Sequence, residues 1–441
     1  MTFLDRTFQL SAHGTSVRTE ALAGLTTFLT MAYIVVVNPA ILGQAGMPAS
    51  AVAAATCLSA AVGCFLMGFL ANYPIALAPG MGLNAYFSFT VVQAMGVPWP
   101  TALGLVFLSG CLFLVLTLTG VRQLIISAIP RALFSAIAAG IGLFIALVGL
   151  RSAGLVTANP GTIIGLGHLH SPGARLALIG LALIAVLQAL KVRAGLLIGI
   201  LLTTALGWLL GLASWTPQPY SLTEMTATAF RLDVPAALGL EGRTVGLALV
   251  EILLVFLFVD LFDNLGTLVA VSKRAGLVQP DGTIPRLNRI LLADAGATIV
   301  GSVAGTSTVV SYVESASGVA AGGKTGLTAI VVGLLFLATL FVAPWAQAIP
   351  AAATAPVLVL VGALMISPLT EIDWEDPVVA IPAFLTLVTI PFTFSIANGL
   401  AAGVIAYALL KLATRRLETS DWLLFVLAGL FILRFAVMVA Q

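Results

Sequence analysis

The stretch FLFVDLFDNLGTLVAV, from Phe256 to Val271, places two acidic residues inside a long apolar run. Asp260 and Asp263 stand three residues apart, so on a helix they lie near one face. Burying a charged side chain at membrane depth costs roughly 3 kcal/mol unless it has a partner or a function. The stretch therefore predicts a membrane helix with functional acids, although an Asp that simply bonds a neighbouring helix is the structural alternative.

Apolar runs of similar length recur along the chain. Of its 441 residues, 60% are apolar and 8% are charged, whereas soluble domains carry roughly a quarter charged residues. A run of about 20 residues can cross a bilayer core of about 30 Å. We expect an all-α polytopic membrane protein with fourteen spans, at roughly 21–43, 50–71, 74–93, 100–120, 131–150, 174–191, 194–213, 243–271, 289–303, 304–321, 325–343, 353–369, 377–393 and 396–414. A last apolar stretch, 421–440, contains Arg434 and either crosses the membrane or lies along its surface.

The N-terminus and the distribution of charge indicate the orientation of the chain. The first 20 residues are polar and lack the apolar core of a signal peptide, which predicts an uncleaved, cytoplasmic N-terminus. In this orientation fourteen Lys or Arg residues fall in cytoplasmic segments and four fall outside, as the positive-inside rule requires. We expect no nucleic-acid partner, because the net charge is only +2 and is spread over many loops.

The sequence contains no pattern that indicates a metal site or a cofactor. Its three cysteines all lie within apolar segments and have no metal-binding spacing. Of the three histidines, one lies in the N-terminal tail and two lie in a loop, where solvated side chains are the simplest interpretation. We therefore expect neither a metal nor a cofactor.

The longest polar loop, near 214–242, divides the spans into seven plus seven. Because each half has an odd number of spans, the two halves enter the membrane with opposite orientation. Two such halves form an inverted repeat, as in many secondary transporters. The third spans of the two halves echo each other, since 78–86 reads APGMGLNAY and 304–312 reads AGTSTVVSY.

The third and tenth spans contain residues that break a helix. Pro79, Gly80 and Gly82 interrupt the third span, and Gly, Ser and Thr are dense in the tenth as far as Glu314. Irregular backbone at membrane depth is tolerated only where it is buried in protein or lines a cavity. Small residues also permit tight helix packing, but packing does not explain Glu314. We expect two broken spans that cross, with Asn84 and Glu314 on either side of one site.

Two further patterns have plainer explanations. Phe28, Met31 and Tyr33 in the first span would wall a flat apolar slot, although aromatic residues in a span more often serve packing. Gly318–Thr325 reads GVAAGGKT, which matches the pattern of a phosphate-binding loop. Such a loop needs a preceding strand and a following soluble helix. Here it ends a membrane span, so we do not expect an ATPase.

These motifs resemble those of a known family, the AzgA-like purine permeases of the nucleobase–cation symporter (nucleobase–ascorbate transporter-like) superfamily. TTFLTMAYIVVVNP, LAPGMGLNAYF, DLFDNLGTL and SYVESASGVAAGGKTGLTA look like its signatures, and the resemblance runs from about Phe3 to Arg416. It implies fourteen spans in a seven-plus-seven inverted repeat, with a core domain moving against a gate domain and a possible homodimer through the gate. The implied divisions are a tail (1–20), core spans 1–4 (21–120), gate spans 5–7 (121–213), an extracytoplasmic loop (214–242), core spans 8–11 (243–343), gate spans 12–14 (344–416) and a C-terminal apolar helix (417–441).

The resemblance also implies which residues form the site. The span-eight acid that grips the base matches Asp263, with Asp260 as the alternative. The span-ten acid matches Glu314, the span-three amide matches Asn84, and Thr267 takes the place of a polar neighbour in span eight. Four residues of the tenth span would complete the slot: Ser307, Thr308, Tyr312 and Val313.

These features predict a secondary active transporter, not an enzyme, that imports adenine, guanine or hypoxanthine with protons across a bacterial inner membrane. Burial penalises the charged form of a carboxyl group, so we expect Glu314, assisted by Asp263 and Asp260, to exchange the proton. The loaded core would then slide inward like an elevator. The purine preference stays open, because Asn264 stands where the family has a hydroxyl residue.

Three alternatives remain at this stage. A sulfate-type anion carrier of the same architecture would rely on helix N-termini and avoid acids. A transporter of uracil or xanthine would need a different slot. A channel would need a continuous polar pore, whereas these polar residues cluster at midspan.

Overall fold

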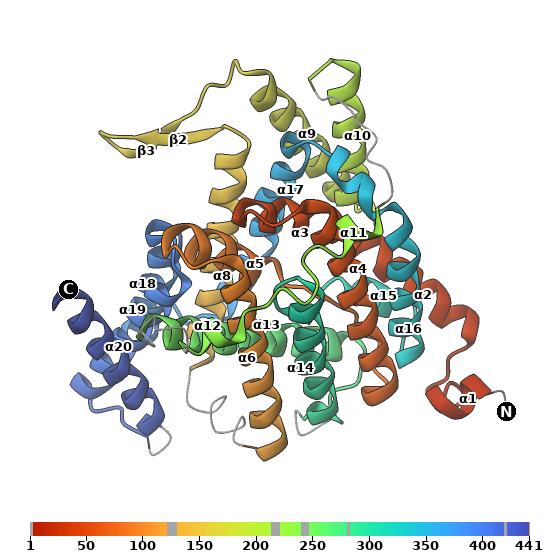
Figure 1. Cartoon of the computed structure of the whole chain (residues 1–441). Coiled ribbons are helices and arrows are strands. Elements are labelled where there is room, and N and C mark those ends of the chain that lie inside the picture. The colour runs from red at the N-terminus through yellow and green to blue at the C-terminus, as the bar shows by residue number, and fades with distance from the viewer. Residues whose placement is uncertain are drawn as a thin grey trace.

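Helices account for most of the chain in the computed structural model, which describes residues 3–120, 130–212, 221–239, 247–279, 283–418 and 421–440 (Figure 1). Within these residues, ten helices are long and apolar enough to cross a membrane: Val17–Ala45, Ala49–Ala71, Trp99–Thr119, Ala132–Ser152, Pro172–Ala189, Leu249–Arg274, Leu287–Ala304, Gly326–Ala343, Ala351–Glu371 and Ile396–Ala413. Three shorter apolar helices accompany them: Gly195–Leu209, Pro377–Thr393 and Trp422–Ala436. The predicted helical membrane protein is confirmed. Parts of the loop predicted at 214–242, and the start of the span predicted at 243–271, lie outside the described residues.

The helices follow one another along both predicted halves of the chain, and the arrangement of fourteen spans stays a prediction. The helices of the first half are α1 (Phe3–Phe8), α2 (Val17–Met31), α3 (Ile34–Leu42), η1 (Gly43–Ala45), α4 (Ala49–Leu66), η2 (Met67–Ala71), α5 (Met81–Ala85), η3 (Tyr86–Ala94), α6 (Trp99–Thr119), α8 (Arg131–Ser152), α9 (Pro172–Ala189) and α10 (Gly195–Leu209). Those of the second half are α11 (Leu222–Met225), α12 (Val234–Ala237), α13 (Leu247–Arg274), α14 (Leu287–Ala304), α15 (Ser315–Ala320), α16 (Gly326–Thr339), η4 (Leu340–Ala348), α17 (Ala351–Leu364), η5 (Ser367–Glu371), α18 (Pro377–Thr393), α19 (Ile396–Ala413) and α20 (Trp422–Ala440). A hairpin of β2 (Val156–Asn159) and β3 (Ile163–Leu166) extends away from the bundle (Figure 1).

The third and tenth predicted spans each begin with a short buried strand, so the expected breaks are present. In the first half β1 (Leu77–Pro79) leads into α5 and η3, and in the second half β4 (Val309–Ser311) leads into α15. Pro79 carries no backbone N–H and favours extended backbone before it, which ends any helix at this point. Gly305, with a φ of +99°, lets the chain leave α14 in a left-handed conformation before β4.

The two strands pair with each other in antiparallel orientation inside the bundle. The register joins Leu77 with Ser311, Ala78 with Val310, and Pro79 with Val309. One further bond at each end extends the ladder: the Gly80 N–H donates to the Thr308 carbonyl at 2.9 Å, and the Tyr312 N–H donates to the Ala76 carbonyl at 3.0 Å. Pairing satisfies the backbone groups that broken helices leave free, which is the condition for placing extended backbone at membrane depth.

Side chains from neighbouring helices hold the paired strands in place. The Thr298 hydroxyl of α14 accepts a hydrogen bond from the Val309 N–H at 3.1 Å and donates to the Val309 carbonyl at 3.0 Å. Cys64 of α4 lies against the other strand, where its sulfur accepts from the Leu77 N–H at 3.3 Å. The Ser315 hydroxyl accepts from the Ala76 N–H at 3.0 Å. The crossing is therefore fixed on both sides.

The long helices pack in two groups on either side of this crossing. One group contains α2, α4, α6, α14 and α16, and the other contains α8, α9, α10, α17, α18 and α19. The first half of the chain and the second half contribute helices to both groups. In Figure 1, α18 and α19 lie on one side of the molecule and α2 and α16 lie on the opposite side.

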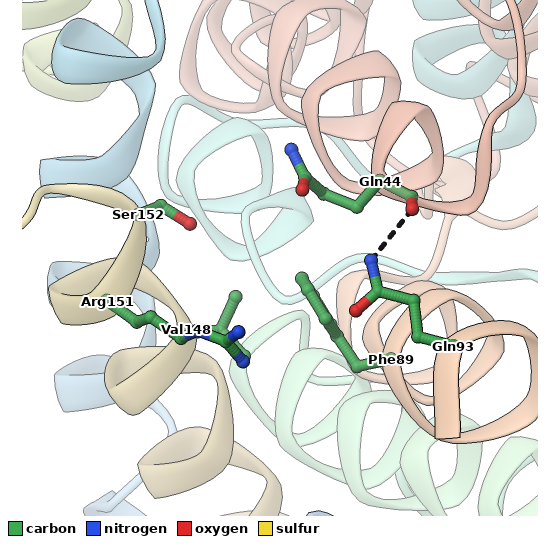
Figure 2. Close-up of a pocket in the computed structure, with 6 residues that line it drawn as sticks. All are labelled: Gln44, Phe89, Gln93, Val148, Arg151 and Ser152. Carbon is green, nitrogen blue, oxygen red and sulfur yellow. Dashed lines mark hydrogen bonds between the residues drawn. The ribbon is translucent and has the colours of Figure 1, made fainter. Parts of the chain in front are cut away.

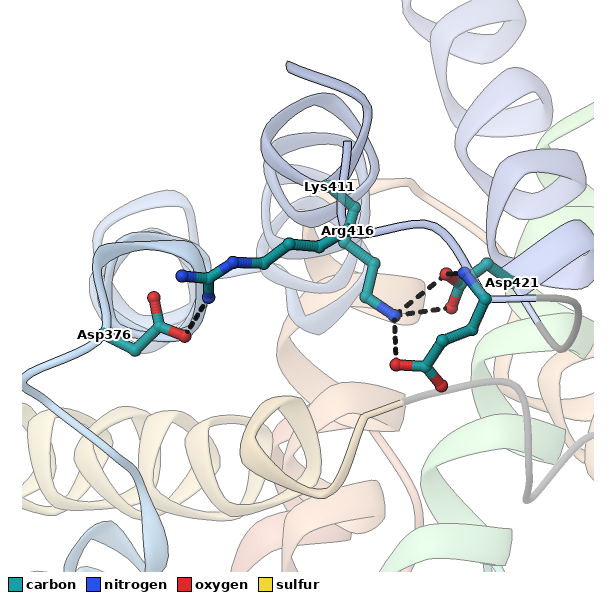
Figure 3. Close-up of polar contacts among 5 residues, drawn as sticks. Asp376, Lys411, Arg416 and Asp421 are labelled. Atoms are coloured by element: carbon teal, nitrogen blue, oxygen red, sulfur yellow. Dashed lines mark hydrogen bonds and ion pairs between the residues drawn. The ribbon is translucent and has the colours of Figure 1, made fainter. Parts of the chain in front are cut away.

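The C-terminal helix α20 packs along α19 and is bonded to the bundle at both ends. Near its start, the Lys411 ammonium of α19 contacts both carboxylate oxygens of Asp421, at 2.8 and 2.9 Å (Figure 3). Near its far end, Arg434 pairs with Glu251 of α13 at 2.5 Å and donates to the Asn398 amide oxygen of α19 at 2.8 Å. The side chains of Arg434 and Glu251 are 12% and 13% exposed. Arg434 thus faces the bundle, where its charge is paired.

Backbone N–H groups at the end of the GVAAGGKT segment bind a carboxylate of the same chain. Glu20 of α2 is fully buried and accepts hydrogen bonds from the Lys324 N–H at 3.0 Å and the Thr325 N–H at 3.2 Å. The Thr328 hydroxyl donates to the same carboxylate at 2.6 Å. These N–H groups, which a phosphate would need, already have an anionic partner at the start of α16. The segment that looks like a phosphate-binding loop is therefore the place where Glu20 joins α2 to the start of α16.

We predict that Glu20→Ala lowers the free energy of unfolding by about 2–4 kcal/mol, because the substitution removes the carboxylate that accepts hydrogen bonds from two N–H groups and one hydroxyl. The melting temperature of the purified protein in detergent measures this effect. Glu375→Ala is the matched control, since Glu375 is exposed. Equal melting temperatures for the two variants would show that the Glu20 contacts do not stabilise the fold.

Candidate functional site

Polar side chains gather where β1 and β4 cross. Several of their buried atoms have no hydrogen-bond partner among the residues that the structure describes: Asn84 Oδ1, Asn264 Nδ2, Ser307 Oγ, Thr308 Oγ1 and Ser311 Oγ. Buried polar atoms are normally paired, so a cluster of unpaired ones calls for an explanation. A polar ligand at the crossing would provide the missing partners.

The two acids predicted for the site come together at this crossing. Glu314 follows β4 directly, and Asp263 lies on α13, which packs against β4 and α15. The two carboxyl groups are close enough for their charges to interact, and Tyr312 interacts with both of them. Both acids are partly buried. Two carboxyl groups from different segments of the chain therefore share one environment.

Tyr33 positions the carboxyl group of Glu314. Its hydroxyl donates a hydrogen bond to Glu314 Oε1 at 2.6 Å, and the tyrosine side chain is fully buried. A hydrogen bond to a charged group is stronger than one between neutral groups. Tyr33 lies between α2 and α3, so the first predicted span reaches the site through this residue.

The Asn84 amide belongs to a network that the sequence analysis did not identify. Asn84 Nδ2 donates to Asn38 Oδ1 at 2.6 Å, and Asn38 Nδ2 donates to the hydroxyls of Thr56 at 2.8 Å and Thr306 at 2.9 Å. Asn38 is fully buried in α3. Its amide thus connects four segments that are distant in sequence. The only sequence signal was a lone amide at the end of the apolar run IVVVNP.

Asn264, which departs from the family pattern, has a structural role in this arrangement. Its side-chain oxygen accepts a hydrogen bond from the Ser311 N–H at 3.2 Å and so joins α13 to β4. The amide nitrogen has no partner among the described residues and is available to donate. A hydroxyl group at this position would provide only one such polar atom.

The remaining predicted residues take different positions around the crossing. Tyr312 donates its hydroxyl to the Pro79 carbonyl at 2.5 Å, whereas the side chain of Val313 is 55% exposed. On α13, Asp260 is buried and Thr267 is partly buried, one helical turn beyond Asp263. Ser307 and Thr308 are fully buried just before β4.

Of the three residues predicted from the first span, Tyr33 bonds Glu314, whereas Phe28 and Met31 make packing contacts. The Phe28 ring meets the Phe336 ring of α16 edge to face, with centroids 5.2 Å apart, and Met31 is fully buried in the hydrophobic core. These contacts agree with the plainer interpretation that the sequence left open.

The assembled groups define what the crossing is able to bind. Carboxylates accept hydrogen bonds, and the amide groups both donate and accept. No group of three or more metal-ligating side chains occurs within the described part of the chain. The arrangement suits a small ligand whose edge carries both donors and acceptors.

Comparison with known proteins places this geometry in a family. The sequence model of the family described as "Permease family" (Xan_ur_permease) matches residues 18–402. The chain is 45% identical to "Adenine permease AdeP" of Escherichia coli (strain K12), covering 98% of this chain and 95% of that protein. It is 44% identical to "Guanine/hypoxanthine permease PbuG" of Bacillus subtilis (strain 168), covering 97% and 98%. It is also 34% identical to "Nucleobase transporter PlAzg2" of Paenibacillus larvae, covering 89% and 77%.

A solved structure supports the fold independently of the sequence. The transmembrane domain of the cyanobacterial bicarbonate transporter BicA superposes with a TM-score of 0.63 at 16% identity, covering 90% of this chain and 98% of that one. At this identity the likeness concerns the fold alone. The resemblance predicted from the motifs is confirmed, and the family and these relatives are transporters rather than enzymes. The chain is a multi-pass membrane protein that belongs to the permease family of the adenine and guanine/hypoxanthine permeases.

Proposed function

We propose that this permease imports the purine bases adenine, guanine and hypoxanthine, together with a proton, across the inner membrane of a bacterium. The observation that carries the proposal is the meeting of Asp263 and Glu314 at the paired strands, in a chain 45% and 44% identical to adenine and guanine/hypoxanthine permeases. In the proposed orientation the N-terminus is cytoplasmic, as the excess of Lys and Arg in the cytoplasmic segments favours.

Recognition follows from the hydrogen-bonding groups of a purine. Its edge alternates ring nitrogens, N–H groups and exocyclic amino or oxo groups, so it needs acceptors and donors side by side. Asp263 and Glu314 accept hydrogen bonds from the base. The Asn84 amide both donates to and accepts from an edge of the base that carries acceptors and donors. The slot is completed by Thr267, Ser307, Thr308, Tyr312 and Val313, whereas Phe28 and Met31 contribute through packing alone.

Proton coupling follows from placing two carboxyl groups together. Two carboxylates held close to each other repel, and a proton bound by one of them removes that repulsion. Glu314 takes up this proton, Asp263 grips the base, and Asp260, one turn earlier on α13, is the alternative proton site. One proton leaves a single carboxylate charged, and the N–H groups of the bound base donate hydrogen bonds to that carboxylate, so base and proton together lower the cost of moving the site through the membrane.

The movement is an elevator-like slide of a core domain against a gate domain. The core consists of 21–120 and 243–343, the gate consists of 121–213 and 344–416, and together they form fourteen spans in two inverted halves. Support comes from the two packing groups and from the antiparallel pairing of equivalent strands in the two halves. Two copies associate through the gate, which stays fixed in the lipid.

The fold alone would equally suit an anion carrier, since a bicarbonate transporter has the same architecture. Two adjacent acids repel anions, so the site argues against this alternative. Uracil and xanthine are planar heterocycles that differ from the proposed substrates in ring size or in their oxo groups, and they test the selectivity of the slot.

Competition for uptake decides between these substrates. We expect proteoliposomes that contain the purified protein to accumulate radiolabelled hypoxanthine when the outside is more acidic than the inside. Excess unlabelled adenine or guanine should abolish the signal, whereas uracil, sulfate and bicarbonate should leave it. Inhibition by sulfate or bicarbonate without inhibition by any purine would contradict the proposal.

Asp263→Asn should weaken purine binding by about tenfold or more, because the substitution replaces a charged acceptor by a neutral amide. Equilibrium binding of the labelled base to detergent-purified protein measures the change. The exposed Glu375 provides the control Glu375→Gln, which should bind like the unmodified protein. Unchanged affinity in Asp263→Asn would remove this residue from the site.

Glu314→Gln should separate transport from the pH gradient. A glutamine cannot carry the proton but keeps the size of the side chain, so exchange of labelled for unlabelled base should persist while accumulation against a gradient is lost. Tyr33→Phe should give a milder result, a shift in the pH profile of uptake, because it removes only the hydrogen bond to Glu314. Accumulation by Glu314→Gln that still followed an imposed pH gradient would rule out this proton site.

A further inference from the structure

A polar cavity lies at the boundary between the two packing groups, away from the crossing. It has a volume of about 200 Å³ and is lined by Gln44, Phe89, Gln93, Val148, Arg151 and Ser152. Figure 2 shows Val148, Arg151 and Ser152 on α8, facing Gln44, Phe89 and Gln93 across the cavity. A second hollow of about 260 Å³ shares Phe89, Gln93 and Arg151 and extends to Phe394, which follows α18. In the proposed orientation both open on the extracytoplasmic side.

Helix η3 connects this cavity to the candidate site. Asn84 and Phe89 lie five residues apart on the continuous helical segment formed by α5 and η3. Because η3 is a π-helix, in which hydrogen bonds span five residues, these five residues make little more than one turn. The cavity therefore lies about one turn beyond the site on the same helical segment.

We propose that this cavity, which we call the outer vestibule, binds the purine base before the base reaches the crossing. The proposal rests on the proposed function, since it concerns the same substrates. Its ligand is a planar heteroaromatic base whose acceptor edge faces Arg151 and whose ring stacks on Phe89.

Arg151 provides the donors. Among the residues that the structure describes it forms no ion pair, and no acidic side chain lines the vestibule. A guanidinium group donates in a planar fork and binds the O6 and N7 acceptors of a 6-oxopurine in bidentate fashion. Arg151 therefore favours guanine and hypoxanthine.

The amides and the aromatic ring accommodate adenine as well. Gln93 donates through Nε2 to the backbone carbonyl of Gln44 at 2.8 Å, which fixes its amide and leaves Oε1 to accept. That oxygen matches the amino group of adenine, which an arginine cannot bind. Stacking on Phe89 tolerates every base, because each has a flat aromatic face.

Aromatic contacts bound the vestibule on its buried side. The fully buried ring of Phe144 meets Phe89 at 6.4 Å and Phe394 at 5.5 Å, both edge to face. The Thr90 hydroxyl donates to the Phe394 carbonyl at 2.5 Å. These contacts join η3 to the other helix group, so they must part before a base passes inward from the vestibule.

Arg151→Ala tests the vestibule. For uptake from outside by intact cells, we expect the KM for hypoxanthine to rise about tenfold, with the maximal rate retained and a smaller effect on adenine. In inside-out vesicles the base enters from the opposite face, so the KM there should stay unchanged. Phe89→Leu should raise the external KM for all three bases. Arg175→Ala is the matched control, because Arg175 is exposed at the start of α9 and lines neither hollow.

Each possible result has a defined meaning. An unchanged external KM in Arg151→Ala, or equal changes at both faces, would overturn the vestibule while leaving purine transport intact. The same would follow if Arg175→Ala had an equal effect, or if Arg151→Ala altered only inhibition by sulfate, which would assign the cavity to anions. If the unmodified protein transported no purine, the proposed function itself would fail.

Discussion

The antiparallel pairing of β1 with β4 is the constraint on which the rest of the structure depends. Three residues of each strand, together with one further bond at each end, satisfy backbone groups that two broken helices would otherwise leave unpaired in an apolar interior. Thr298 and Cys64 hold the pair from α14 and α4. Without this pairing the chain could not keep extended backbone at membrane depth, and the polar side chains around the crossing would not be brought together.

Buried charge in this molecule falls into two kinds. Glu20, Lys411 and Arg434 each have partners within the fold, and each joins two separate elements. These pairs pay for their burial through direct contact and serve the architecture. Asp263 and Glu314 differ, because no cation pairs with either of them within the described residues and their like charges interact with each other. Groups in that situation are suited to a proton and a ligand that come and go.

Substrate would encounter two environments of opposite character along one helix. At the outer end of η3, Arg151 supplies positive charge and donors beside the ring of Phe89. About one turn further in lie Asn84, which bonds Asn38, and the crossing to which we assign the two acids. A purine offers acceptors on one part of its edge and donors on another, so the two places can engage different parts of the same molecule. The aromatic contacts of Phe144 between the helix groups separate them.

The sequence by itself determined that the protein folds in lipid, which membrane segments are broken, and which acids are candidates for the site. A chain that is 60% apolar has to fold in lipid, Pro79 and Gly80 prevent a continuous helix, and Asp263 and Glu314 stand out because charge is rare at membrane depth. Only the tertiary structure decided which groups meet. Asn38, Tyr33 and Glu20 find partners 18 to 308 residues away, and no local pattern specifies such contacts. Local propensity acts over a few residues, whereas hydrogen bonds between helices depend on how those helices pack, and packing emerges only when the whole chain has folded.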